Sequence, residues 1–214
     1  PLTRIRLVAS SLVEQPAASD DQATSIKIIH QASVDMSNLV DQLLLLARLE
    51  GSGVKEGESC AINQAVHSAI EAARGTRTVQ QQSTVADDLA VTGPSADITR
   101  AIQNLVQNAV RYSPEVNPVV VRIDREDQNC IVSVVDQGMG IAAQDIEKLG
   151  ERFYRTDSSR SRDVGGTGLG LAITKEIVHR CGGSLSFESE PGKGTTATIK
   201  LPIFENSSKK INSK

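Results

Sequence analysis

The chain has 214 residues, 39% of them hydrophobic and 23% charged, with a formal net charge of −3. This length and composition predict a folded core in one large domain, or in one domain with an appendage, and the negative charge excludes a global basic surface for nucleic acid. Cys60, Cys130 and Cys181 are odd in number and far apart, which argues against zinc or disulfides and favours reduced, cytosolic thiols. The longest apolar run, Leu43–Ala47, is too short to span a membrane.

The first fifty residues predict two helices joined by a short loop. Residues 1–15 carry apolar side chains at helical intervals, and the stretch from Pro16 breaks that pattern. A second apolar stripe follows in alternating steps of three and four residues, which is typical of a coiled coil or a four-helix bundle. Because such a hairpin cannot bury both faces alone, a partner hairpin is implied; the alternative is a pair of core helices in one domain. The stripe comprises Ile26, Ile29, Ser33, Met36, Val40, Leu43 and Ala47.

The rest of the chain predicts an α+β sandwich, in which one mostly antiparallel sheet is covered on one face by helices. A Gly-rich linker is expected over 51–60, and a polar, disordered tail over 205–214. The helix over 95–111 is expected to be capped by Ser95. Further helices are predicted at 61–74, 142–149 and 168–180, two short strands within 78–92, and hairpins from 119–123 with 131–135 and from 184–188 with 195–201.

A first chemical signal lies on the helix over 95–111. Asn104 and Asn108 are four residues apart and therefore share a face. A carboxamide oxygen is a neutral, hard ligand, suited to Mg²⁺ that also binds phosphates. Arg111 would add a phosphate-directed charge and Tyr112 a flat face for a base; the alternative is two solvent-facing amides.

A second signal follows a buried strand, where Asp136 precedes Gly138 and Gly140. A carboxylate fixed at a strand end can accept from an exocyclic amino group such as adenine N6, and the glycines allow a close backbone approach. Residues 138–143 also fit the G-x-G-x-x-A dinucleotide fingerprint, with Asp157 as the acid. The context argues against that alternative, because no second strand precedes Asp157.

A third signal is the Gly-rich stretch 165–171, which leads into a helix. Backbone N–H groups at such a helix N-terminus bind phosphate oxygens, although the stretch is no Walker loop because GxxxxGK[ST] is absent. The alternative is a flexible hinge with a helix cap. The basic segment 155–162 before it is predicted to act as a lid over phosphates.

Taken in this order, these motifs together with Phe153-Tyr154-Arg155 resemble the N, G1, F and G2 boxes of sensor histidine kinases. The resemblance covers roughly residues 1–204 and implies the Bergerat (GHKL) ATP-binding fold. It implies a dimerisation hairpin at 1–50, a linker at 51–60 and an ATP-binding domain at 61–204. Gly150 and Met139 depart from the residues frequent in the family, and Gly150 is expected to loosen the lid.

The resemblance also implies cofactors and roles. ATP and Mg²⁺ would bind here, with Asn108 as metal ligand and Asn104 supporting it, Asp136 on the adenine amino group, Tyr112 against the base, and Arg111 and Arg155 near the phosphates. The ATP-binding residues expected are Asn104, Asn108, Arg111, Tyr112, Asp136, Gly138, Gly140, Ile141, Arg155, Gly166, Thr167, Gly168, Leu169 and Gly170.

The N-terminus resembles the end of the family's His-Glu-Leu-Arg-Thr-Pro-Leu box, which places the expected phosphoacceptor histidine before Pro1. His30, His67 and His179 lack a neighbouring acid and are expected to be structural or solvated. The implied function is the cytoplasmic catalytic part of a homodimeric membrane sensor kinase, which passes phosphate from ATP to a histidine and then to a response-regulator aspartate. The membrane would be reached only through segments outside this chain. The alternatives are a nucleotide-gated, non-catalytic interaction module, or an anti-sigma-type serine kinase or ATP-driven clamp on the same fold.

Overall fold

The computed structural model forms two compact units, Pro1–Arg48 and Leu49–Lys214. The helix expected over 1–15, the tail expected over 205–214 and the lid expected over 155–162 lie largely outside the residues described. The structure describes residues 5, 10, 20–51, 53–55, 57–75, 77–156 and 166–205.

The long helix α2 (Asp20–Glu50) carries the apolar stripe expected from the sequence. Much of that stripe is exposed within this chain: Ile29 is 51% exposed, Met36 53% and Val40 40%, whereas Ser33 is buried and its hydroxyl donates to the Ile29 carbonyl at 2.8 Å. A stripe left open in one chain is the pattern that a helical seam between chains requires. Among the described helices, none is long and apolar enough to cross a membrane.

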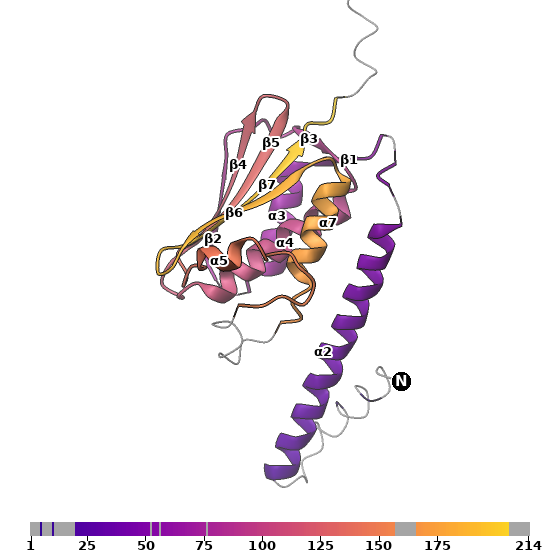
Figure 1. Ribbon diagram of the computed structural model, residues 1–214, viewed down its shortest axis with the longest axis vertical. Helices are drawn as coiled ribbons and strands as arrows, with labels where there is room; N and C mark the ends of the chain where they lie inside the picture. Colours follow the sequence, from indigo (N-terminus) through magenta and orange to yellow (C-terminus); the bar gives the residue numbers. More distant parts are fainter. Residues whose placement is uncertain are drawn as a thin grey trace, which may run out of the picture. The chain divides into compact units, whose positions relative to one another are not determined.

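The second unit is built on a five-stranded sheet in the order β2-β4-β5-β7-β6 (Figure 1). Both predicted hairpins are present, and every neighbouring pair is antiparallel except β2 with β4, which is parallel. The sheet is therefore mixed. Its strands are β2 (Val79–Ser83), β4 (Val119–Glu126), β5 (Asn129–Asp136), β6 (Ser184–Glu190) and β7 (Gly194–Pro202).

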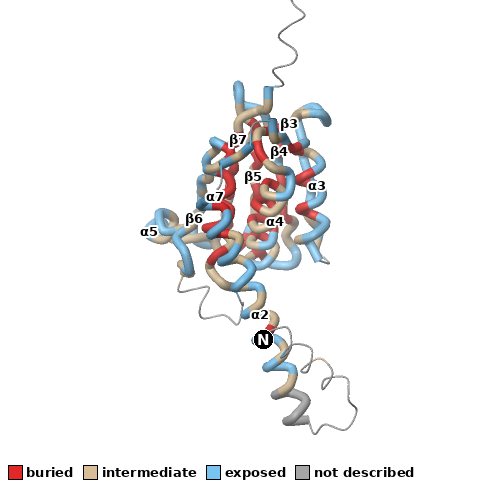
Figure 2. The backbone as a smooth tube through the Cα atoms, turned by 90° about the vertical axis from the view of Figure 1, so that its right-hand side faces the viewer, coloured by how far each residue is buried: buried red, intermediate tan, exposed pale blue. Residues whose placement is uncertain are grey.

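Three helices cover one face of this sheet: α3 (Ile62–Ala73), α4 (Ser95–Tyr112) and α7 (Gly170–Arg180). Figure 2 shows buried segments along α4, α7 and the strands that they face. The alternation of β-branched residues predicts this one-sided burial, and the expected α+β sandwich is confirmed. The strand residues in the core are Val119, Val121, Ile123, Cys130, Val132, Val134, Ala197, Ile199 and Leu201.

Three local predictions were wrong in detail. The end of the expected linker forms strand β1 (Ser59–Ala61), which pairs with β3 (Ala90–Thr92). Ser95 does not cap α4, because Pro94 is the residue before the helix and the Ser95 hydroxyl donates to the Ser59 carbonyl at 3.4 Å. The short helix expected over 142–149 is confined to α5 (Ala143–Ile146) and continues as turns.

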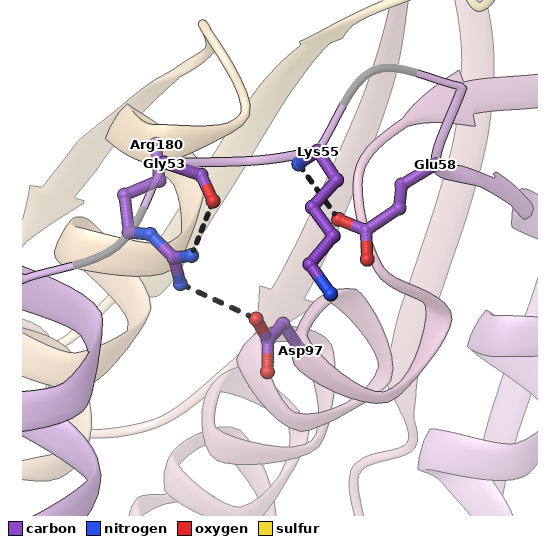
Figure 3. A network of polar contacts seen from close by, with 5 residues as sticks. All are labelled: Gly53, Lys55, Glu58, Asp97 and Arg180. Carbon is purple, nitrogen blue, oxygen red and sulfur yellow. Dashed lines mark hydrogen bonds and ion pairs between the residues drawn. The ribbon is translucent and has the colours of Figure 1, made fainter.

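A polar network joins the last turn of α7, the first turn of α4 and the segment before β1 (Figure 3). Arg180 Nη1 lies 3.4 Å from Asp97 Oδ2, and Nη2 donates to the Gly53 carbonyl at 3.3 Å. The Lys55 backbone N–H donates to the Glu58 carboxylate at 3.0 Å. Because the Arg180 and Asp97 side chains are only 12% and 24% exposed, water screens this pair less than a surface pair.

We expect the Arg180–Asp97 pair to show a coupling free energy of about 1 kcal/mol in a double-mutant cycle of Arg180→Met and Asp97→Asn. The cycle cancels the separate effect of Asp97 on the α4 dipole. Urea unfolding measures it, and the exposed pair Arg74–Glu71 is the matched control, expected below about 0.5 kcal/mol. Equal coupling in the two pairs would contradict the role of burial.

Candidate functional site

The carboxylate of Asp136 lies half-buried at the end of β5. Its Oδ1 accepts the Gly138 backbone N–H at 2.7 Å. Burial raises the pKa of Asp136 above its ordinary value, while hydrogen bonds from the Gly138 and Thr195 backbone and the nearby Ser113 hydroxyl oppose that rise. Ser113 Oγ is itself buried, and no described residue gives it a hydrogen bond of good geometry. The Ser113 hydroxyl beside the half-buried carboxylate is a second polar group at this end of β5.

The loop after Asp136 is held between α4 and the β6–β7 turn. A Cβ added at Gly138 would lie 2.5 Å from the Tyr112 carbonyl, so only glycine permits this approach. On the other side, the Gly192 N–H donates to the Met139 carbonyl at 2.8 Å, and the Ile141 N–H donates to Ser189 Oγ at 2.8 Å. The Ile141 N–H is therefore already used within the protein.

Helices α4 and α7 meet at the side chain of Asn104. Its Nδ2 donates to the Gly170 carbonyl at 3.0 Å and to Thr174 Oγ1 at 3.3 Å. Asn108 is half-buried one turn further along α4, on the same face. Among the described residues, no side chain caps the start of α7, so the backbone N–H groups of its first turn are candidate donors for an anion.

Two arginines converge on Gly166, close to the start of α7. Arg155 Nη1 donates to the Gly166 carbonyl at 3.1 Å, and Arg111 Nη1 lies 2.9 Å from the position that a Cβ of Gly166 would take. The Leu169 N–H donates to Thr167 Oγ1 at 3.3 Å. Positive charge beside a helix N-terminus favours a phosphate group.

The neighbouring segment 153–156 is attached at two points. The Phe153 N–H donates to the Gly168 carbonyl at 3.1 Å, and a Cβ at Gly168 would lie within 2.8 Å of the Phe153 backbone. The Tyr154 hydroxyl donates to Asp145 Oδ1 at 2.7 Å. This anchors the residues just before the expected lid (155–162), of which residues 157–162 are outside the described residues.

The structure thus brings eight of the fourteen predicted site residues into three groups, and α4 contributes to each of them: Asp136 with Gly138 and Tyr112, Asn104 with Gly170, and Arg111 with Arg155 and Gly166. The dinucleotide alternative is wrong, because β5 pairs antiparallel with both neighbours and is no part of a βαβ unit. Sequence reasoning did not single out four residues that the structure places around these groups. They are Ser113, Thr174, Ser189 and Thr195.

Comparison with known families matches both parts of the chain. Residues 93–205 match the family described as histidine kinase-, DNA gyrase B-, and HSP90-like ATPase. Residues 1–52 match the His Kinase A (phospho-acceptor) domain. The ATPase match includes α4, Asp136 and the start of α7, and so contains all three groups of site residues.

Individual relatives agree with these matches. The chain is 36% identical over 96% of its length to sensor histidine kinase WalK of Bacillus subtilis, and 32% identical over 95% to the sensor-like histidine kinase SenX3 of Mycobacterium tuberculosis. It spans 35% and 51% of those two proteins. The solved structure of the mycobacterial sensor histidine kinase MprB, 32% identical, superposes with a TM-score of 0.62 over 70% of this chain and 100% of that one. The chain therefore belongs to the sensor histidine kinase family.

Proposed function

We propose that this chain binds ATP with Mg²⁺ and supplies the γ-phosphoryl group for transfer to a histidine and then to a response-regulator aspartate. The observation that carries the proposal is the placement of a half-buried carboxylate, two carboxamides and two arginines around α4 and the start of α7, which no side chain of the described residues caps. Residues 1–50 would form the dimerisation hairpin, 51–60 the linker and 61–204 the ATP-binding domain. The intact protein would be a homodimer attached to a membrane by segments outside this chain, with this portion in the cytoplasm.

The adenine would lie at the Asp136 end. Its exocyclic amino group is a donor, and the ionised Asp136 carboxylate is an acceptor whose Oδ1 is fixed by the Gly138 N–H at 2.7 Å. The Ser113 hydroxyl, which lies beside this carboxylate, supplies a second polar group. Tyr112, half-buried with its carbonyl against Gly138, is in place to lie against the base.

The phosphates would lie between α4 and the start of α7, near Arg111 and Arg155. The residues present fit Mg²⁺, because the carboxamide oxygens of Asn108 and Asn104 are hard, neutral donors. The described residues contain no cluster of three or more acidic, histidine or cysteine side chains that would form an all-protein cage. The ion would therefore share its ligands with phosphates and water, and its charge would neutralise the triphosphate.

Replacing the proposed metal ligand gives the direct test of ATP binding. Asn108→Ala should weaken ATP binding in Mg²⁺ at least roughly tenfold, because it removes a metal ligand, and should leave the weaker binding in EDTA unchanged. Titration calorimetry measures both affinities. The matched control is Gln107→Ala, the exposed neighbour on the same helix, which should have no effect. Unchanged affinity of the Asn108 variant in Mg²⁺ would remove this residue from the site.

Phosphoryl transfer is tested separately with γ-labelled ATP and the phosphoacceptor hairpin of a relative as the substrate. Acid-labile label on the histidine of that hairpin is the expected result, because positioning and charge neutralisation are what this site can supply. Acid-stable label on serine would favour a serine kinase on the same fold. Tight ATP binding with no transfer to any acceptor would favour a nucleotide-gated interaction module.

A further inference from the structure

The side chain of Thr174 is fully buried on α7, yet it ends in a hydroxyl group. Its exposed fraction is 0%. The hydroxyl lies 3.0 Å from the Gly170 carbonyl one turn earlier on α7, and 3.4 Å from the Ala101 carbonyl on α4. It also accepts Asn104 Nδ2 at 3.3 Å. Thr174 therefore contacts both helices that carry the proposed phosphate end of the site.

These contacts fix which way the Asn104 carboxamide faces. The Gly170 carbonyl can only accept, so the Asn104 atom at 3.0 Å from it must be the nitrogen. The second amide proton points to Thr174 Oγ1, whose own proton goes to a backbone carbonyl. With both protons of the amide used towards α7, Oδ1 is the atom of Asn104 left to accept or coordinate. None of the hydrogen bonds made by the described residues uses it.

Packing alone does not require a hydroxyl at this position. Its neighbours Ile173 and Ile177 are also buried, and valine would fill the same volume. A buried hydroxyl costs free energy unless it is hydrogen-bonded, and a bond to the helix's own Gly170 carbonyl would satisfy only its proton. As an acceptor, the Thr174 hydroxyl oxygen takes a hydrogen bond from one described side chain, that of Asn104.

On the basis that this site binds ATP with Mg²⁺, we propose that Thr174 is a positioning residue that holds the Asn104 carboxamide with its oxygen turned towards the metal-chelated phosphates. Thr174 itself touches neither nucleotide nor metal. It acts by locking the orientation of a side chain on the neighbouring helix, and so couples the α4 face to the start of α7.

The test compares Thr174→Val, which removes the hydroxyl at constant volume, with Thr174→Ser, which retains it. Thr174→Val should lower the affinity for ATP with Mg²⁺ by roughly three- to tenfold, the value of one lost hydrogen bond. Thr174→Ser should stay near the wild type. Adenosine, which has no phosphates, should bind the wild type and both variants equally. In an Asn104→Ala background, Thr174→Val should have no further effect.

Three outcomes would overturn the proposal: unchanged affinity of Thr174→Val for ATP with Mg²⁺, equal losses of ATP and adenosine binding, or a full effect in the Asn104→Ala background.

A readout without nucleotide separates this proposal from the proposed function. The Asn104 side-chain NH₂ resonances should exchange slowly with water in the wild type and Thr174→Ser, and rapidly in Thr174→Val. If these protons exchange slowly in a folded wild type that binds no ATP, the proposed function is rejected but the Thr174–Asn104 contact is supported. If they exchange at the same rate in all three proteins, that contact is rejected.

Discussion

Asp136→Asn is expected to lower the affinity for ATP by roughly a hundredfold, the loss that follows when a charge-assisted hydrogen bond is replaced by a repulsive contact. The Gly138 N–H will hold the oxygen of the new amide where it now holds Oδ1, at 2.7 Å. The amide nitrogen must then take the place of the second carboxylate oxygen. It would present a donor to the donor amino group of adenine, so the two groups cannot form a hydrogen bond.

Calorimetry with ATP and with adenosine measures this effect, which should appear with both ligands because it concerns the base. The matched control is Asp124→Asn, a carboxylate on β4 that accepts the Thr84 hydroxyl at 2.8 Å outside the site. That variant should bind both ligands like the wild type. An Asp136→Asn protein with undiminished affinity for adenosine would place base recognition elsewhere.

The same substitution should also change how the stability of the unliganded fold depends on pH. Burial raises the pKa of Asp136, so the folded state binds its proton more tightly than the unfolded state does. The contribution of this group to stability is therefore present below its unfolded pKa and is lost as the pH rises through the folded pKa. Relative to the wild type, the variant should gain stability as the pH rises from about 4, up to the folded pKa, and then stay constant. Urea unfolding at several pH values measures this difference.

The elements that the sequence predicted well are those whose signals are local. The inward face of α4 follows from apolar residues at helical spacing, and the two hairpins follow from β-branched runs around polar turns. Strand β1 and the parallel pairing of β2 depend on partners about thirty to forty residues away, which no local pattern reveals. The misplaced cap at Ser95 has the same cause, since its hydroxyl is taken by the Ser59 carbonyl of β1.

The residues of the proposed site also differ in whether a local sequence signal or the packed fold identifies them. Asn104, Asp136 and Gly138 stand out in the sequence because amides, an acid and glycines interrupt apolar elements. Thr195 faces Asp136 only through the register between β5 and β7. Thr174 lies beside Asn104 only because two helices distant in sequence pack together. A serine or threonine in a regular element carries no distinctive signal of its own, and so the residues that support the site emerge only from the packed fold.

Gly140→Ala is expected to unfold the Asp136 loop and to remove measurable ATP binding. Gly140 has φ of +66°, and a Cβ there would lie 2.0 Å from the Glu190 carbonyl oxygen and 2.9 Å from Pro191 Cα. Both are backbone atoms of the β6–β7 turn, so no side chain can move aside. The loop would have to leave the turn and lose the bond from the Gly192 N–H to the Met139 carbonyl. Left-handed strain and overpacking together should cost about 2–5 kcal/mol.

Gly192→Ala separates these two causes, because Gly192 also has a left-handed φ, +80°, but a Cβ there would meet nothing within 4 Å. It should cost only the strain, about 1–2 kcal/mol by urea unfolding, and leave ATP affinity unchanged. Because both glycines belong to the same loop contact, the difference between the two variants isolates the clash with Glu190. If Gly140→Ala instead matches Gly192→Ala in stability and in ATP affinity, the loop does not need this close approach, and the position of Asp136 does not depend on the β6–β7 turn.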